Sequence, residues 1–373
     1  MFSSLDLDIQ PGEGLGIFQL GASLWAVLDL LRTHHHAFPH VAVQYDADAP
    51  TTPVLLHIRP HLDLLFSPAQ QRLHTIAVRS LRDPNPPLTL TYKSAVLSSS
   101  SKPLRRVDVS RAFGPTYPGR HLQYPGVRFL FEDDANGEKG ERTQEVARIL
   151  VTQADGHDGA GIPDALGEPA VCPAMYGDVA EAIVKVHEGV DLRFYAAESP
   201  IVVRVRLGLT TAQDLLTDLG PPLRTFYKED DRMAIHGRTH PDVLPAPSYF
   251  YNYFQYGMDF LIADGTHVVT KIVMHSNIPG TALFQRYKRC PWQIEGRPED
   301  DEDDSPPRVR FEDRVETISH FLAPGEAPPS MHFNRTDEEE TLTLRSATTR
   351  LLGFDGIILE ATEGAQVVGV TLV

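Results

Sequence analysis

The chain has little cysteine, a shortage of positive charge and no long hydrophobic run. Two cysteines, Cys172 and Cys290, occur in 373 residues, which excludes a disulfide framework or a thiolate zinc site built by this chain alone. A formal net charge of −16 argues against binding to nucleic acid, which needs a basic surface. The apolar segments fall short of the roughly 20 residues that span a bilayer, and the N-terminal sequence does not resemble a secretory signal. We therefore expect a cytoplasmic protein.

The motifs of common enzyme classes are also missing. The stretch "PGEGLGIFQLG" (Pro11–Gly21) is rich in glycine but lacks the spacing of a dinucleotide fingerprint, and no lysine before Lys93 could complete a P-loop. The run "HHH" (His34–His36) would point in successive directions around a helix, so its side chains would not converge on one metal ion. We predict no enzyme, no cofactor and no metal site. A nucleotide-binding or hydrolytic activity is the alternative that thermal stabilisation by nucleotide would reveal.

A short helix followed by an apolar hairpin recurs along the chain. The hairpin patterns are His61–Val78, Gly126–Val151, Gly257–His275 and Gly353–Val373. The helical segments have one apolar face, with apolar residues at i, i+3, i+4 and i+7. This pattern predicts an α+β fold of about four repeated units, each a short helix packed on a small antiparallel sheet, arranged as two halves.

Composition predicts the boundaries of the halves. Residues 1–151 would form an N-terminal half with two units, and residues 172–373 a C-terminal half with two more. The segment 152–171 is rich in glycine and polar residues, so we expect a flexible linker there. An acidic, proline-flanked insert near 295–308 cannot bury enough apolar surface to order itself, so we expect disorder.

Three glycines fit structural turns. "FQLGAS" and "VRLGLT" each end a strand at leucine, and Gly21 and Gly208 would make the turn into the helix that follows. A hydroxyl residue two positions later, Ser23 or Thr210, could cap that helix. Gly220 stands between a helical pattern and two prolines, where glycine is the usual helix terminator. We predict that these glycines have an architectural role.

The segment "PSYFYNYFQYGMDF" (Pro247–Phe260) has an unusual density of aromatic residues. As a strand it would place its tyrosines on one face, which could be a half-exposed part of the core or a surface for protein recognition. The residues that we consider candidates for binding a partner are Tyr249, Tyr251, Asn252, Tyr253, Phe226 and Tyr227.

Several segments resemble a known family. "GLGIFQLGASLWAVLDLLR", "LDLLFSPAQQRLHTIAV", "LGPPLRTFYKEDDRMAIH" and "FYNYFQYGMDFLIADGTHVVTKIVMHSNIPG" occur in the same order as similar segments of the phagosome assembly factor 1 family, and Leu219–Gly280 is the most specific part. The resemblance implies a non-enzymatic adaptor in autophagy that forms a complex with a WD-repeat β-propeller protein at the phagophore assembly site. Membrane association would then be indirect, through the partner.

The alternative function is direct binding of a phosphoinositide or another lipid. A cleft between the two halves would hold the lipid, and Arg286, Lys288 and Arg289 in "QRYKRC" would contact its headgroup. Flotation with liposomes in the absence of a partner would separate the two functions.

Overall fold

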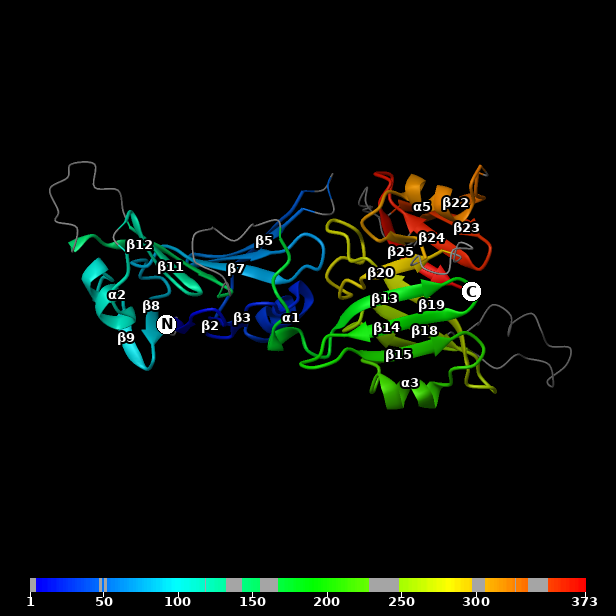
Figure 1. Cartoon of the computed structure of the whole chain (residues 1–373), viewed down its shortest axis with the longest axis horizontal. Helices are drawn as coiled ribbons and strands as arrows, with labels where there is room; N and C mark the ends of the chain where they lie inside the picture. Colours follow the sequence, from blue (N-terminus) through cyan, green and yellow to red (C-terminus); the bar gives the residue numbers. More distant parts are fainter. Residues whose placement is uncertain are drawn as a thin grey trace, which may run out of the picture. The chain divides into compact units, whose positions relative to one another are not determined.

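A computed structural model describes residues 5–46, 49, 52–117, 119–131, 143–154, 167–227, 248–296, 306–325, 327–334 and 348–373. The chain forms two compact units, Met1–Met175 (unit 1) and Tyr176–Val373 (unit 2), whose elements are labelled in Figure 1. The predicted linker (152–171) and acidic insert (295–308) lie largely outside the described residues.

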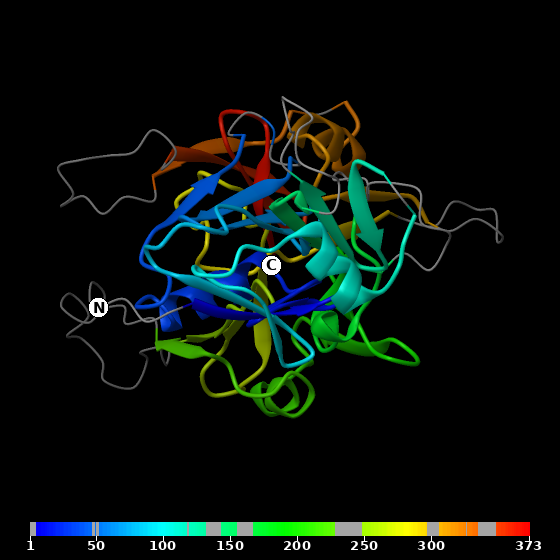
Figure 2. The same ribbon diagram turned by 90° about the vertical axis from the view of Figure 1, so that its left-hand side faces the viewer.

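Unit 1 contains two sheets. The five-stranded sheet has the order β3-β2-β1-β8-β9, and the seven-stranded sheet has the order β10-β11-β12-β7-β6-β5-β4. The strands are β1 (Leu5–Gln10), β2 (Gly14–Leu15), β3 (Phe18–Gln19), β4 (Val41–Gln44), β5 (Val54–Ile58), β6 (Leu62–Phe66), β7 (Leu73–Val78), β8 (Leu88–Tyr92), β9 (Ala95–Ser98), β10 (His121–Tyr124), β11 (Val127–Phe131) and β12 (Val146–Thr152), and the helices are α1 (Leu24–Thr33), α2 (Arg106–Phe113) and the 3-10 turn Pro173–Met175. Figure 2 shows these sheets from another direction.

Unit 2 also contains two sheets. The five-stranded sheet has the order β15-β14-β13-β20-β21, and the eight-stranded sheet has the order β16-β17-β18-β19-β25-β24-β23-β22. The strands are β13 (Val179–Lys185), β14 (Gly189–Phe194), β15 (Ile201–Arg206), β16 (Arg224–Tyr227), β17 (Tyr249–Tyr253), β18 (Met258–Ile262), β19 (Val269–His275), β20 (Trp292–Glu295), β21 (Arg308–Arg310), β22 (Ser330–Asn334), β23 (Thr348–Phe354), β24 (Ile357–Ala361) and β25 (Val367–Leu372), and the helices are α3 (Ala212–Asp218) and α5 (Val315–Leu322).

The two units share one topology. In each five-stranded sheet the first strand of the unit pairs in parallel with a strand from much later in the sequence, β1 with β8 and β13 with β20, whereas the other pairs are antiparallel. In each larger sheet, the last strand of the unit pairs with the strand after which the chain passes to the five-stranded sheet. These pairs are β12 with β7 and β25 with β19. The isolated bridges at the helix entrances also correspond, Ser23 with Arg72 and Thr211 with Val268.

The predicted fold class is wrong. The chain is mostly β, with 46% strand and 12% helix, and the described residues include four α-helices of seven to ten residues. Hairpins are present, but they do not close separate small sheets, because the pairs β12–β7 and β19–β25 join them into sheets of seven and eight strands. Local turn and strand patterns do not specify such long-range pairings.

The two ends of the helices explain the glycine pattern, because Gly21 and Gly208 precede α1 and α3 and Gly220 follows α3. Gly21, Gly208 and Gly220 all have positive φ, from 71° to 83°, where a side chain would be strained. Ser23 caps α1, and its hydroxyl accepts a hydrogen bond from the Ala26 backbone N–H at 3.2 Å. Helix α3 differs from our expectation, because its cap is Thr211. The Thr210 hydroxyl instead accepts the Arg206 backbone N–H at 2.8 Å.

Candidate functional site

Strand β16 forms one edge of the eight-stranded sheet and exposes aromatic side chains. It pairs with β17 alone, so its outer edge has no neighbouring strand among the described residues. Phe226 and Tyr227 are 46% and 60% exposed. Phe226 lies opposite Phe250 and Tyr227 opposite Tyr249, with the rings of Tyr227 and Tyr249 5.6 Å apart. Because successive side chains of a strand point to opposite faces, Phe226 and Tyr227 lie on the two faces of this accessible edge, each opposite an aromatic residue of β17.

The tyrosines of β17 face the core. Tyr253 has no exposed surface, and its hydroxyl donates a hydrogen bond to the Gly220 carbonyl oxygen at 2.8 Å. Tyr249 is also buried, and burial, followed by the influence of Tyr251, raises its pKa to about 12. Tyr251 is half-buried, and its ring lies 5.4 Å from that of Tyr249. The strand thus buries most of the face that we considered for recognition.

The lipid-headgroup candidates all lie in unit 2, and two of them are buried in structural contacts. Lys288 forms an ion pair with Asp178. Arg289 donates from Nε to the Ser276 carbonyl oxygen at 2.8 Å, and its guanidinium lies over the ring of Phe311. Arg286 is exposed, with its guanidinium 5.8 Å from the centre of the Phe254 ring.

A buried carboxylate, which the sequence did not single out, organises the face of β17 and β18 opposite the tyrosines. Asp259 is 6% exposed and accepts three hydrogen bonds: from Asn252 Nδ2 at 2.6 Å, His275 Nε2 at 2.9 Å and the Tyr287 hydroxyl at 2.8 Å. The rings of His275 and Tyr287 stack with their centres 3.7 Å apart. The candidate Asn252 therefore belongs to this buried cluster rather than to an open surface.

A small cavity lies beside this cluster. Its lining includes His275 of β19 and Glu360 of β24, and the Thr349 hydroxyl donates to Glu360 Oε1 at 2.8 Å. Gly369 pairs with both His275 and Glu360 on the strand between them, so no side chain fills the gap. The cavity volume of about 20 Å³ is room for about one water molecule. This space is too small for a lipid.

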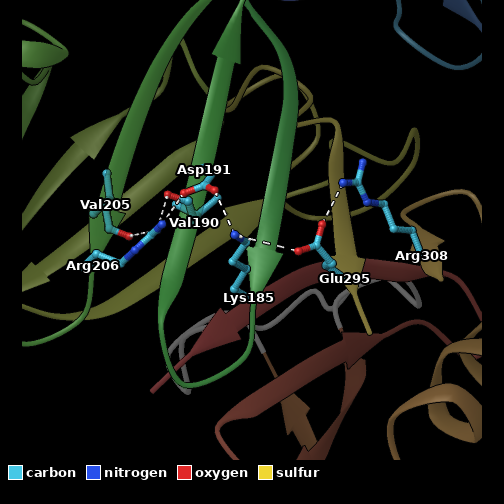
Figure 3. Close-up of polar contacts among 7 residues, drawn as sticks. All are labelled: Lys185, Val190, Asp191, Val205, Arg206, Glu295 and Arg308. Carbon is cyan, nitrogen blue, oxygen red and sulfur yellow. Dashed lines mark hydrogen bonds and ion pairs between the residues drawn. The ribbon is translucent and has the colours of Figure 1, made fainter. Parts of the chain in front are cut away.

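A row of alternating charges crosses the five-stranded sheet of unit 2 (Figure 3). Its members follow the strand order: Arg206 (β15), Asp191 (β14), Lys185 (β13), Glu295 (β20) and Arg308 (β21). Asp191 Oδ1 accepts from Arg206 at 2.6 Å and its Oδ2 lies 3.3 Å from Lys185 Nζ, whereas Glu295 lies between Lys185 at 3.8 Å and Arg308 at 2.7 Å. The row ties all five strands together and surrounds each carboxylate with two cations.

The described residues show neither a metal site nor a membrane span. Within them, no group of three or more His, Cys, Asp or Glu side chains could hold a metal ion. None of the helices there is both long and apolar enough to cross a membrane.

Two topologically equivalent units with open sheet edges define a duplicated, mostly β protein. The chain belongs to the phagosome assembly factor 1 family, whose family model matches residues 14–373, and this confirms the resemblance seen in the sequence. It is 27% identical to a PHAF1 protein of Arabidopsis thaliana over 77% of this chain and 74% of the relative. It is 24% identical to a PHAF1 protein of Caenorhabditis elegans over 95% and 90% of the two chains, and 25% identical to one of Drosophila melanogaster over 99% and 94%. No solved structure matches the chain significantly.

Proposed function

We propose that this chain is a non-enzymatic adaptor in autophagy that binds a WD-repeat β-propeller protein at the phagophore assembly site. The family description as a phagosome assembly factor supports a role in assembly. In this proposal the chain is cytoplasmic and reaches membranes through its partner. The buried ion pair of Lys288 and the buried contacts of Arg289 do not favour direct lipid binding at those residues.

The observation that carries the proposal is the exposed aromatic edge of β16. Large aromatic side chains dominate binding energy at protein interfaces, where losing one often costs 2 kcal/mol or more. Phe226 and Tyr227 are held on a strand opposite Phe250 and Tyr249, so part of the freedom that an aromatic side chain loses on binding is already restricted. The open backbone of β16 adds hydrogen-bonding groups that a partner strand could use.

The test compares tagged full-length chains expressed in cells. The double variant Phe226→Ala/Tyr227→Ala removes the aromatic edge, and Tyr117→Ala is the control because Tyr117 is 91% exposed in unit 1. β-Propeller proteins that co-purify are quantified by mass spectrometry. We expect recovery with the wild type and the control, and a loss of roughly tenfold or more with the double variant. Failure to recover any β-propeller protein would refute the partner, and equal recovery by all three chains would refute the surface.

A further inference from the structure

Strand β15 is an open edge of the five-stranded sheet in unit 2. It pairs with β14 on one side, and no described strand lies on the other. The Leu207 N–H donates to the Glu188 carbonyl oxygen, which lies on the β14 side. Backbone groups point to alternate sides along an antiparallel strand, so those of Val202 and Arg204 point away from β14. At Arg206 the outward N–H is already used by the Thr210 hydroxyl. No described residue uses the outward backbone groups of Val202 and Arg204, which therefore offer donors and acceptors at the edge.

The equivalent edge of unit 1 is much shorter. Strand β3 occupies the same place in its sheet as β15 does, but it has two residues whereas β15 has six. Proteins commonly protect sheet edges by shortening them, because an exposed edge can pair with another chain. The β15 sequence "IVVRVR" is instead rich in β-branched residues, with Ile201 60% and Val202 47% exposed. Unit 2 therefore keeps a long, pairing-competent edge where unit 1 does not.

The face beside this edge carries an excess of positive charge in an acidic chain. Following the strand alternation from the row in Figure 3, the charged side chains on this face are Lys185, Arg193, Arg204, Arg206, Arg308 and Arg310, against Glu181, Asp191 and Glu295. The three carboxylates already contact cations of the same face. Arg204 and Arg310, at opposite edges, have no ionic partner among the described residues. An added strand next to β15 would meet Arg204 first.

We propose that the β15 edge binds an extended acidic segment of another protein, which adds to the sheet as a sixth strand. Its backbone would pair with the outward groups of Val202 and Arg204, and a carboxylate opposite Arg204 would lie within the usual cross-strand distance of about 5 Å between Cβ atoms. A second copy of the chain is a poor occupant, because two paired β15 edges would bring their arginines together. This surface is separate from β16, so it does not depend on the function proposed above.

The experiment measures binding of a fluorescent peptide of about seven residues that alternates glutamate with valine. Fluorescence anisotropy is recorded with the full-length chain. Arg204→Glu reverses the charge at an exposed position, and we expect binding to weaken by about tenfold or more. Val202→Pro removes one outward N–H without removing a hydrogen bond to β14, and we expect binding to be lost. Arg310→Glu is the matched control at the far edge of the same face, with an expected change below about twofold.

Two further peptides separate backbone pairing from charge. A peptide that alternates lysine with valine should not bind, and a glutamate–valine peptide with methylated backbone nitrogens should bind at least about tenfold more weakly. The proposal is refuted if either peptide binds as tightly as the unmodified glutamate–valine peptide. It is also refuted by an undetectable interaction of the wild type with the glutamate–valine peptide at about 1 mM, or by identical affinity of wild type and Arg204→Glu. Thermal unfolding verifies that each variant is folded. If Val202→Pro does not fold, the comparison of the wild type with Arg204→Glu, a substitution at an exposed position, still decides the test.

The other occupants have their own signatures. Phosphatidylserine vesicles that bind in an Arg204-dependent manner, without peptide binding, would show that the face contacts a membrane instead. Concentration-dependent dimerisation in sedimentation, abolished by Val202→Pro, would show that a second copy takes the edge. Either outcome overturns the proposal. Capture of a β-propeller protein through β16 would be unaffected by all of these variants, so the two proposals can fail independently.

Discussion

Replacing Asp259 tests whether the buried polar cluster stabilises unit 2. The Asp259→Ala substitution removes the common acceptor of Asn252, His275 and Tyr287 at a site that is 6% exposed. Each donor left unsatisfied in a buried site costs about 1–3 kcal/mol, although relaxation and entering water recover part of the sum. We therefore expect unit 2 to lose about 3–5 kcal/mol.

The two tryptophans allow this loss to be measured in one unit. Trp25 lies in unit 1 and Trp292, which has no exposed surface, lies in unit 2, so a Trp25→Phe background makes fluorescence report on unit 2. Urea unfolding curves of Asp259→Ala in that background are compared with those of Asp264→Asn, an exposed turn position where asparagine suits the backbone equally well. The control should change stability by less than about 0.5 kcal/mol. A loss below about 1 kcal/mol for Asp259→Ala would refute the reasoning.

Two other predictions concern titratable groups. Burial raises the pKa of the Cys290 thiol, so iodoacetamide should label the half-buried Cys172 in the native protein and spare Cys290 until unfolding; equal labelling by mass spectrometry would contradict this. Burial alone would raise the pKa of Asp191, but hydrogen bonds and positive charge from Arg206 and Lys185 outweigh it and lower the pKa. Its stabilising effect is therefore present above the ordinary aspartate pKa and lost as pH falls through the lower native value. Asp191→Asn should lower the free energy of unfolding by about 1 kcal/mol at pH 7. The difference in this free energy between the variant and the wild type should shrink below about pH 4.

Local features of the fold could be predicted from the sequence. The i, i+3, i+4, i+7 spacing of apolar residues predicted helices with one apolar face, and the residues with this spacing in α1, Leu24, Val27, Leu28 and Leu31, are buried. Helical periodicity is a property of neighbouring residues, so the sequence shows it. The strand pairings could not be predicted in this way. The parallel pair β1–β8 joins segments some eighty positions apart, and nothing in either segment alone specifies the other. That limit explains why we predicted small independent sheets.

The candidate site shows the same limit at the level of side chains. The alternation of tyrosines in β17 indicated two faces, but which face is buried depends on the layer that packs against it, where the hydroxyl of Tyr253 reaches the Gly220 carbonyl. Asp259 carried no signal in the sequence, because Asn252, His275 and Tyr287 meet it only after β17, β18, β19 and the segment beyond β19 are assembled. Exposure on β16 likewise follows from its edge position.

The shared topology lets the surfaces of the two units be compared strand by strand. The strands β1 and β13 hold equivalent places in their sheets, yet β1 presents Asp6 and Asp8 on its outer face, with the Thr91 hydroxyl donating to Asp8 at 2.9 Å, whereas the unit 2 face is dominated by arginine and lysine. Residues on a solvent-facing side of a sheet can change charge without disturbing the core, because alternate positions along each strand belong to different faces. The two units thus keep one framework of pairings and differ in edge length and surface charge. In the two binding proposals made above, specificity would be set by those edges and faces rather than by the fold itself.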